Sequence, residues 1–119
     1  MRIGIMSGAG GPGDTIDTLV AKGQDVERRG FAALWMANIF SLDAITTLAI
    51  VGRETKRIEL GTAVVPTYPR HPFAIAQQTL TAQQAARGRF TLGIGLSHKI
   101  VIEGMFGLSY EKPARHMRE

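Results

Sequence analysis

Apolar residues recur along this chain with two alternating spacings, one typical of strands and the other typical of helices. Short apolar runs predict strands at residues 1–6, 31–36, 57–65 and 90–95. Between these runs, apolar residues three or four positions apart predict amphipathic helices that begin near residues 14, 41 and 72. Strands that alternate with helices across short loops are typical of a parallel sheet with right-handed crossovers.

Residues that favour helix ends flank the predicted helices. Asp14 and Ser41 are expected N-caps, because their side-chain oxygens can accept hydrogen bonds from the first free N–H groups of a helix. Pro72 suits the first turn of the third helix, where its missing N–H costs nothing. Gly30 and Gly88 follow the first and third helices, as expected for residues that end a helix in a left-handed conformation.

Two architectures fit this alternation, a doubly wound open sheet and an eightfold (β/α) barrel. Residues 114–119 predict the first turn of a fourth helix. At roughly 30 residues per unit, eight units need about the 250 residues of a typical barrel. We therefore expect an α/β fold that is the N-terminal half of a TIM (β/α)8 barrel. On this interpretation, residues 1–119 form a single partial domain of about four β/α units, truncated at the start of the fourth helix.

The composition is that of an ordinary globular protein, with 45% hydrophobic and 20% charged residues. The chain has no cysteine, which excludes disulfides, thiolate chemistry and cysteine-ligated zinc. Its first apolar run is too short for a signal peptide, and no run approaches the ~20 residues of a membrane span. We therefore expect a cytoplasmic protein without a membrane partner.

The net charge of +4 raises the question of nucleic-acid binding. The basic residues are scattered, however, and several fall near predicted helix C-termini, where they complement the helix dipole. No basic block alternates with aromatic residues, as single-strand binders require. We expect no nucleic-acid partner and a mild attraction for anionic small molecules.

A glycine-rich loop follows the first predicted strand. Gly8, Gly10 and Gly13 fit the G-x-G-x-x-G pattern of dinucleotide-binding proteins. The second strand, however, ends at Asn38 instead of an acid that could bind a ribose, and Asp14 would repel a pyrophosphate. We interpret the loop as the rim of a barrel. An NAD-binding domain remains an alternative, which a strand order that reverses after the first strand would favour.

Two polar residues mark the ends of predicted strands, where barrel enzymes place their chemistry. Asn38 follows the second strand, and His98 comes shortly after Gly93 and Gly95 of the fourth. Each residue can equally be a polar loop residue, so the residues alone leave a functional and a structural role open. The three histidines lack the spacing of metal ligands, and we expect no metal site.

The chain resembles the luciferase-like monooxygenase superfamily in three stretches: GFAALWMANIF, RIELGTAVVPTYPRHPFAIAQQTLT and GRFTLGIGLSHKIVIEGMFG. It is most similar to the branch of coenzyme F420-dependent oxidoreductases. The resemblance extends over essentially the whole chain and corresponds to the N-terminal part of a longer (β/α)8 barrel. It implies an enzyme that transfers a hydride between coenzyme F420 and an organic substrate. The alternatives are an FMN-dependent monooxygenase of the same superfamily and a non-catalytic half-barrel or cofactor-binding paralogue.

The resemblance also implies where a cofactor would bind. The family has a bulge with a non-prolyl cis peptide after the third strand, and that peptide corresponds to Ala63-Val64. On this basis we expect Ala63, Val64 and Val65 to lie behind the deazaflavin ring. Gly95 and Ser97 are expected to border the same cofactor.

Two of the implied residues carry polar chemistry. Asn38 stands where many members have an Asp or a His, so it can hydrogen-bond the ring or the substrate but cannot act as an acid or a base. His98 matches a position where the family often has an acid, and an imidazole could serve there in acid–base catalysis. Lys99, Arg70 and His71 are weaker candidates for binding the phosphate or the polyglutamate tail.

Further expectations follow for the whole protein. Its partner is a small-molecule substrate, and the full-length protein is expected to form a homodimer. Because half of the barrel would be absent, we expect the 119-residue chain alone not to turn over substrate. Its two free sheet edges also predict association.

Overall fold

The computed structural model describes residues 1–9 and 11–119, so Gly10 of the glycine pattern lies outside the described residues. In the described part, four parallel strands form the main sheet, in the order β1 (Gly4–Ala9), β2 (Ala33–Asn38), β3 (Glu59–Thr62) and β5 (Phe90–Thr91). A second parallel pair consists of β4 (Val65–Pro66) and β6 (Ile94–Gly95). The helices are α1 (Ile16–Arg28), α2 (Ala44–Glu54), α3 (Pro72–Ala85), α4 (Lys99–Gly104) and α5 (Pro113–His116).

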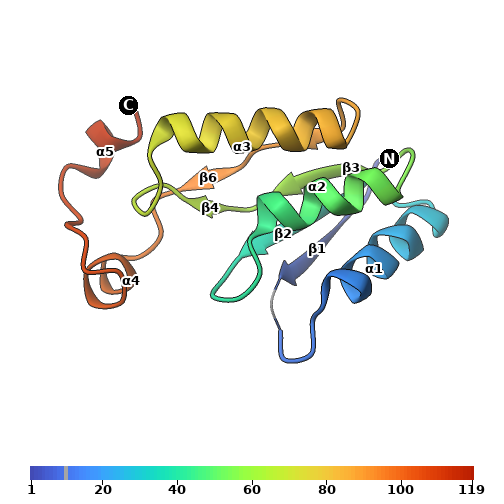
Figure 1. The fold of residues 1–119 in the computed structure, drawn as a ribbon, viewed down its shortest axis with the longest axis horizontal. Helices are drawn as coiled ribbons and strands as arrows, with labels where there is room; N and C mark the ends of the chain where they lie inside the picture. The colour runs from blue at the N-terminus through green and yellow to red at the C-terminus, as the bar shows by residue number, and fades with distance from the viewer. Residues whose placement is uncertain (10) are drawn as a thin grey trace.

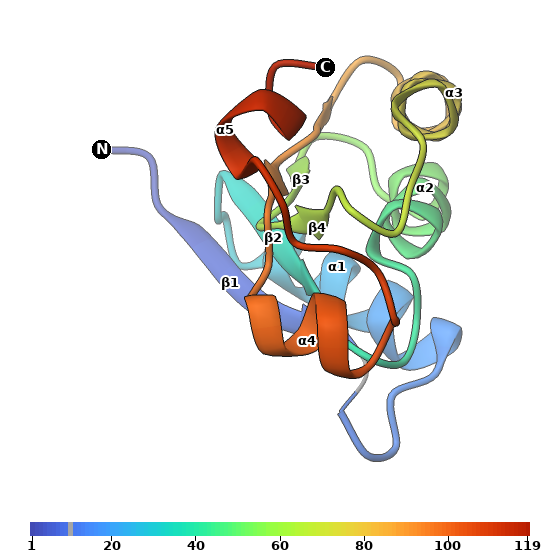
Figure 2. The same ribbon diagram turned by 90° about the vertical axis from the view of Figure 1, so that its left-hand side faces the viewer.

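The strand order follows the order of the chain, without a reversal after β1. Helices α1, α2 and α3 lie side by side on one face of the sheet, and α4 and α5 lie beyond the carboxyl ends of the strands (Figure 1, Figure 2). A doubly wound domain would carry helices on both faces and reverse its strand order. The predicted parallel α/β arrangement is therefore confirmed, and its topology is that of a barrel segment.

The hydrophobic core lies between the sheet and these helices. Leu34 and Met36 of β2 are fully buried, and they belong to one cluster with Leu48 and Val51 of α2. The alternation along β2 sends the intervening Trp35 to the opposite face of the sheet, where it is half-buried. A continuous apolar run therefore supplies both faces of a parallel strand, as the sequence predicts.

Glycines allow close approach at two positions of this packing. A Cβ added to Gly61 would lie 2.3 Å from the ring of Trp35, so the indole rests directly on the backbone of β3. A Cβ added to Gly52 would lie 2.7 Å from the Cβ of Ala86, where α2 meets the C-terminus of α3. The small residues in the predicted helix stripes are thus contact points between elements.

Two charged side chains tie the start of β3 to its neighbours. The carboxylate of Glu27 accepts hydrogen bonds from the backbone N–H groups of residues 56–58. Burial raises the pKa of Glu27, but these hydrogen bonds outweigh it and hold the pKa below its usual value. The guanidinium of Arg89 donates to the carbonyl oxygens of Gly52 and Ile58. Arg89, which follows α3 in the chain, therefore satisfies part of the C-terminus of the neighbouring helix α2.

Thr62 joins the two sheets at the point where β3 and β5 end. Its hydroxyl accepts a hydrogen bond from the N–H of Gly93 and donates one to the carbonyl of the same residue, both at 2.9 Å. The N–H of Val65 also donates to the Gly93 carbonyl. A Cβ on Gly93 would lie 2.0 Å from the carbonyl oxygen of Thr62, so only glycine permits this contact.

The prediction of one continuous fourth strand over 90–95 is wrong, because this contact divides it into β5 and β6. The third predicted strand is divided in the same way into β3 and β4. The first two predicted strands are shifted by about three and two residues, to Gly4–Ala9 and Ala33–Asn38. Pairing between neighbouring strands sets these bounds, and apolar content alone does not reveal it.

The N-caps of α1 and α2 also differ from the expected residues. Thr15 caps α1 in a reciprocal capping box with Thr18, while Asp14 accepts a hydrogen bond from the N–H of Gly11. Asp43, not Ser41, caps α2. In each case a second oxygen-bearing residue close by in the sequence makes the better geometry.

The remaining helix ends agree in part with the sequence prediction. Pro72 begins α3 as expected. Gly30 directly follows the C-cap of α1 with a φ of +83°, which confirms its role as a helix terminator. After α3 the first left-handed residue is Arg87, with a φ of +54°, and Gly88 follows it with a φ of +83°. Helix α4 was not predicted. The last predicted helix, over 114–119, is the single turn α5 at Pro113–His116.

We expect Thr62→Val to lower the free energy of unfolding by about 1–3 kcal/mol, because it leaves the partly buried N–H of Gly93 without its hydrogen-bond partner. The measurement is urea unfolding followed by circular dichroism. Thr81→Val is the matched control: Thr81 is exposed, and its hydroxyl only donates within α3 to the carbonyl of Gln77. If both variants lose the same free energy of unfolding, the hydrogen bonds between Thr62 and Gly93 stabilise the fold no more than a bond on the helix surface does.

Candidate functional site

A cleft of about 690 Å³ opens beyond the carboxyl ends of β2, β4 and β6, against helix α4. Its walls come from the loop after β2, the proline-containing loop after β4, and the segment that runs through α4. The lining residues are Ala37, Asn38, Ile39, Phe40, Ser41, Val64, Pro66, Pro69, Arg70, Ser97, His98, Val101, Met105 and Phe106. Most of these side chains are apolar, and a few polar groups lie among them, as in typical small-molecule sites.

The segment between β3 and β4 forms one wall of the cleft. Its Ala63–Val64 peptide is cis, so this implication of the family resemblance is confirmed. The side chain of Val64 is 43% exposed and lines the cleft. A Cβ on Gly95 would lie 2.5 Å from Val64 Cγ2, so the bare backbone of β6 supports Val64 from one side.

The neighbouring residues of this segment lie further from the cleft. Val65 is fully buried and belongs to the hydrophobic core, so its side chain does not reach the surface where a ligand would lie. Ala63 is half-buried and, like Gly95, is not part of the lining. Of these residues the structure brings only Val64 to the cleft surface, and Gly95 acts by leaving room for it.

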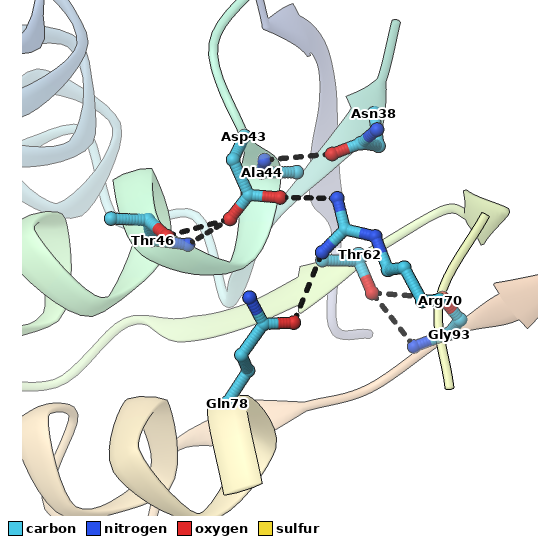
Figure 3. A network of polar contacts seen from close by, with 8 residues as sticks. All are labelled: Asn38, Asp43, Ala44, Thr46, Thr62, Arg70, Gln78 and Gly93. Carbon is cyan, nitrogen blue, oxygen red and sulfur yellow. Dashed lines mark hydrogen bonds and ion pairs between the residues drawn. The ribbon is translucent and has the colours of Figure 1, made fainter. Parts of the chain in front are cut away.

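Asn38 lies at the end of β2 and lines the cleft. Its Oδ1 accepts a hydrogen bond of 2.9 Å from the N–H of Ala44, at the start of α2 (Figure 3). A backbone N–H can only donate, so this contact fixes the orientation of the side-chain amide. The structural role that the sequence left open is therefore real, and the Nδ2 group is the part of Asn38 that a ligand can use.

His98 and Ser97 lie where β6 leads into α4. His98 occupies the N-cap position of α4, yet its side chain makes no capping hydrogen bond, and its exposed ring lines the cleft. Ser97 has a φ of +63°, in the left-handed region that favours glycine. The hydroxyl of Tyr110 donates to the carbonyl of Ser97 at 3.4 Å and so helps to hold this turn.

Arg70 and Asp43 connect two loops of the cleft. The Arg70 guanidinium forms an ion pair with Asp43 at the start of α2 and donates to Oε1 of Gln78 in α3 (Figure 3). Asp43 also accepts hydrogen bonds from the N–H and hydroxyl of Thr46. Burial raises the pKa of Asp43, but the bonds from Thr46 and Arg70 outweigh it, so the pKa lies below its usual value.

The three basic residues suggested for a phosphate or tail site all have partners within the protein. Arg70 is paired with Asp43. Lys99 lies 3.8 Å from a carboxylate oxygen of Glu103 along α4. Nδ1 of His71 accepts a hydrogen bond from the N–H of Phe73, which caps α3. Each of these side chains therefore has a contact within the protein that accounts for its position.

Sequence reasoning missed the apolar part of the cleft. Ile39 and Phe40 follow β2, and Met105 and Phe106 follow α4; all four are exposed and line the cleft. The available signal was their position, because large apolar residues directly after a strand or a helix lie outside the periodicity that buries a core.

Metal and membrane sites are not found in the part of the chain that the structure describes. No three or more histidine or acidic side chains come together there as metal ligands would. None of the described helices has the length and hydrophobicity to cross a bilayer.

Comparison with known proteins identifies the family. The family model for luciferase-like monooxygenases matches residues 1–119. The chain belongs to the luciferase-like monooxygenase family. A protein of Mycobacterium tuberculosis, provisionally named a coenzyme F420-dependent oxidoreductase, is 36% identical over 121 residues, which cover 100% of this chain and 34% of that relative. The chain thus spans about a third of the length of this curated relative.

Solved structures of luciferase-like proteins share the fold. The coenzyme F420-dependent tetrahydromethanopterin reductase of Methanopyrus kandleri matches 98% of this chain and 37% of its own, with a TM-score of 0.82 and 23% identity. The oxygenating constituent of 3,6-diketocamphane monooxygenase of Pseudomonas putida, in complex with FMN, has a TM-score of 0.85 and 18% identity over 99% of this chain and 36% of its own. At these identities the likeness shows the fold alone, and it confirms a partial TIM barrel.

We expect Asp43→Asn to lower the free energy of unfolding at pH 7 by about 1–3 kcal/mol. Asparagine keeps the helix cap, so the loss isolates the charge that binds Arg70. Because the pKa of Asp43 is lower in the folded protein than the ~3.9 of an unfolded chain, this stabilisation is complete at neutral pH. It is lost as the pH falls through the folded pKa, so the difference from wild type narrows at pH 3.

Urea unfolding at the two pH values checks this prediction. Asp25→Asn is the control, because Asp25 also pairs with arginines but on the exposed surface of α1, where such pairs contribute little. A difference between wild type and Asp43→Asn that stays constant from pH 7 to pH 3 would contradict the assigned role of the charge.

Proposed function

We propose that this chain supplies part of the active site of an oxidoreductase that transfers a hydride between coenzyme F420 and an organic substrate. The observation that carries the proposal is the cleft at the strand ends, with Val64 on one wall and Asn38 and His98 beside it. The family and the 36% identical relative, which is named for coenzyme F420, support the same interpretation. The alternative is an FMN-dependent monooxygenase, because a monooxygenase with the same fold has been solved in complex with FMN.

The residues of the cleft suit a flat, largely apolar ring system. Its volume of about 690 Å³ lies within the 300–1,000 Å³ that is usual for small-molecule and cofactor sites. Val64 has a stiff branched side chain, and its close contact with Gly95 prevents that side chain from moving away from the cleft. Coenzyme F420, when bound, supplies the hydride chemistry.

The polar residues of the chain have separate roles in this proposal. The Nδ2 group of Asn38 donates a hydrogen bond to an acceptor on the ring or the substrate, while its Oδ1 stays on Ala44. His98 acts as a general acid or base: one of its imidazole nitrogens gives a proton to the reacting molecules or takes one from them. Arg70 and Asp43 fix the loops around the cleft and touch no reacting atom.

Gly95→Ala is expected to weaken binding of coenzyme F420 at least about tenfold, because the new methyl group would displace Val64 from the cleft wall. The measurement is a fluorescence titration of the protein with coenzyme F420, and a parallel titration with FMN. Gly104→Ala is the matched control, since a Cβ at Gly104 meets nothing within 4 Å. Circular dichroism spectra of both variants verify that they are folded.

The two titrations separate the cofactors. Tight binding of FMN without binding of coenzyme F420 would reject the deazaflavin proposal in favour of the FMN-dependent monooxygenase. Unchanged F420 affinity in Gly95→Ala would instead remove Val64 from the cofactor site.

We expect the 119-residue chain by itself to show no F420-dependent turnover. The active site of a TIM barrel is built from eight loops at one face, and this chain spans about a third of its curated relative. An F420 absorbance assay with the purified chain checks this expectation. Turnover at the rate of a complete luciferase-like oxidoreductase would contradict it.

A further inference from the structure

Several large apolar side chains of the cleft are exposed, and this feature bears on the substrate. Phe40 is 64% exposed and Met105 is 60% exposed, and Ile39 and Phe106 beside them are also largely exposed. The two pairs come from segments more than 60 residues apart in the chain, yet they line one cleft. Soluble proteins seldom expose contiguous apolar surface without a ligand or partner to cover it.

The charges of the cleft lining cancel. Arg70 is the only described lining residue with a permanent charge, and its guanidinium is already paired with Asp43. Lys99 and Glu103 lie close to the cleft but pair with each other and do not line it. A charged ligand would therefore lose its hydration without gaining an ion pair from a permanently charged side chain, which is costly at an apolar surface.

The remaining polar groups favour an acceptor on the ligand. Asn38 is held by Ala44 through its oxygen, so it presents the donor side of its amide to the cleft. A carbonyl or hydroxyl oxygen would satisfy this donor. The aromatic rings and the thioether among the lining side chains suit a flat apolar body.

We infer that the substrate is an uncharged molecule with a flat apolar body and one carbonyl or hydroxyl oxygen. The apolar body lies between the pairs Ile39-Phe40 and Met105-Phe106, and the oxygen meets Asn38. This inference rests on the proposed function, whose substrate class it specifies. It disfavours phosphorylated and carboxylated substrates, because Arg70, the one permanently charged lining residue in the described part of the chain, is already paired with Asp43.

The test uses three probes with the same ring and different charges: 2-acetonaphthone, 2-naphthoate and 2-naphthylmethylammonium. Titrations of the protein are followed by the NMR shifts of the probe. We expect 2-acetonaphthone to bind at least about tenfold more tightly than either charged probe. Equal or tighter binding of 2-naphthoate or of the ammonium probe would overturn the inference.

Two phenylalanine variants locate the binding. Phe40→Ser should weaken binding of 2-acetonaphthone at least about fivefold, because it removes an aromatic wall of the cleft. Phe73→Ser is the matched control, since Phe73 is equally exposed, at 66%, but lies on α3 and does not line the cleft. A loss in Phe73→Ser as large as that in Phe40→Ser would show adsorption to any exposed ring and would overturn the inference.

A titration of the same samples with coenzyme F420 distinguishes an error in the substrate class from an error in the proposed function. A protein that binds F420 but prefers 2-naphthoate contradicts only the substrate class. A protein that binds no F420 contradicts the proposed function, whatever its preference among the naphthalene probes.

Discussion

The contact between Thr62 and Gly93 is the constraint on which the site depends. One hydroxyl satisfies both the N–H and the carbonyl of Gly93, and the carbonyl also accepts from Val65. No side chain fits at Gly93, because the carbonyl of Thr62 occupies its place. The contact ends β3 and β5 at the same level and lets both chains continue as the separate pair β4 and β6. Specific hydrogen bonds therefore cause the break in the sheet, and it does not result from a low strand propensity of these residues.

The walls of the cleft follow from this break. Val64 leaves the sheet between β3 and β4 and reaches the cleft surface, while Val65 turns back into the core. The ion pair between Asp43 and Arg70 then joins the loop after β2 to the loop after β4. Because both ends of that pair are partly buried and hydrogen-bonded, it restrains the loops more than a surface pair would. What remains between the loops is an apolar cleft with few polar groups.

Much of the architecture could be predicted from local sequence patterns. Apolar runs predicted the parallel strands, and Gly30 ended α1 as expected from its freedom at positive φ. The resemblance to luciferase-like proteins placed the cis peptide at Ala63–Val64. Caps were less predictable: Asp43 replaced Ser41 because the residue whose oxygen reaches Thr46 depends on where the strand before it ends. Val65 was expected to lie behind the cofactor ring, and its side chain packs in the hydrophobic core.

The sequence by itself determined the alternation of strands and helices, the parallel fold class and the positions of Asn38 and His98 at strand ends. These features depend on residues close together in the chain, whose spacing and backbone preferences act locally. Only the tertiary structure decided that the side-chain oxygen of Asn38 accepts a hydrogen bond from Ala44. It also decided that Arg70 pairs with Asp43, and that Phe40 and Phe106 line the same cleft. Those contacts join residues from 6 to 66 positions apart, and only the packing of separate elements determines which of them meet.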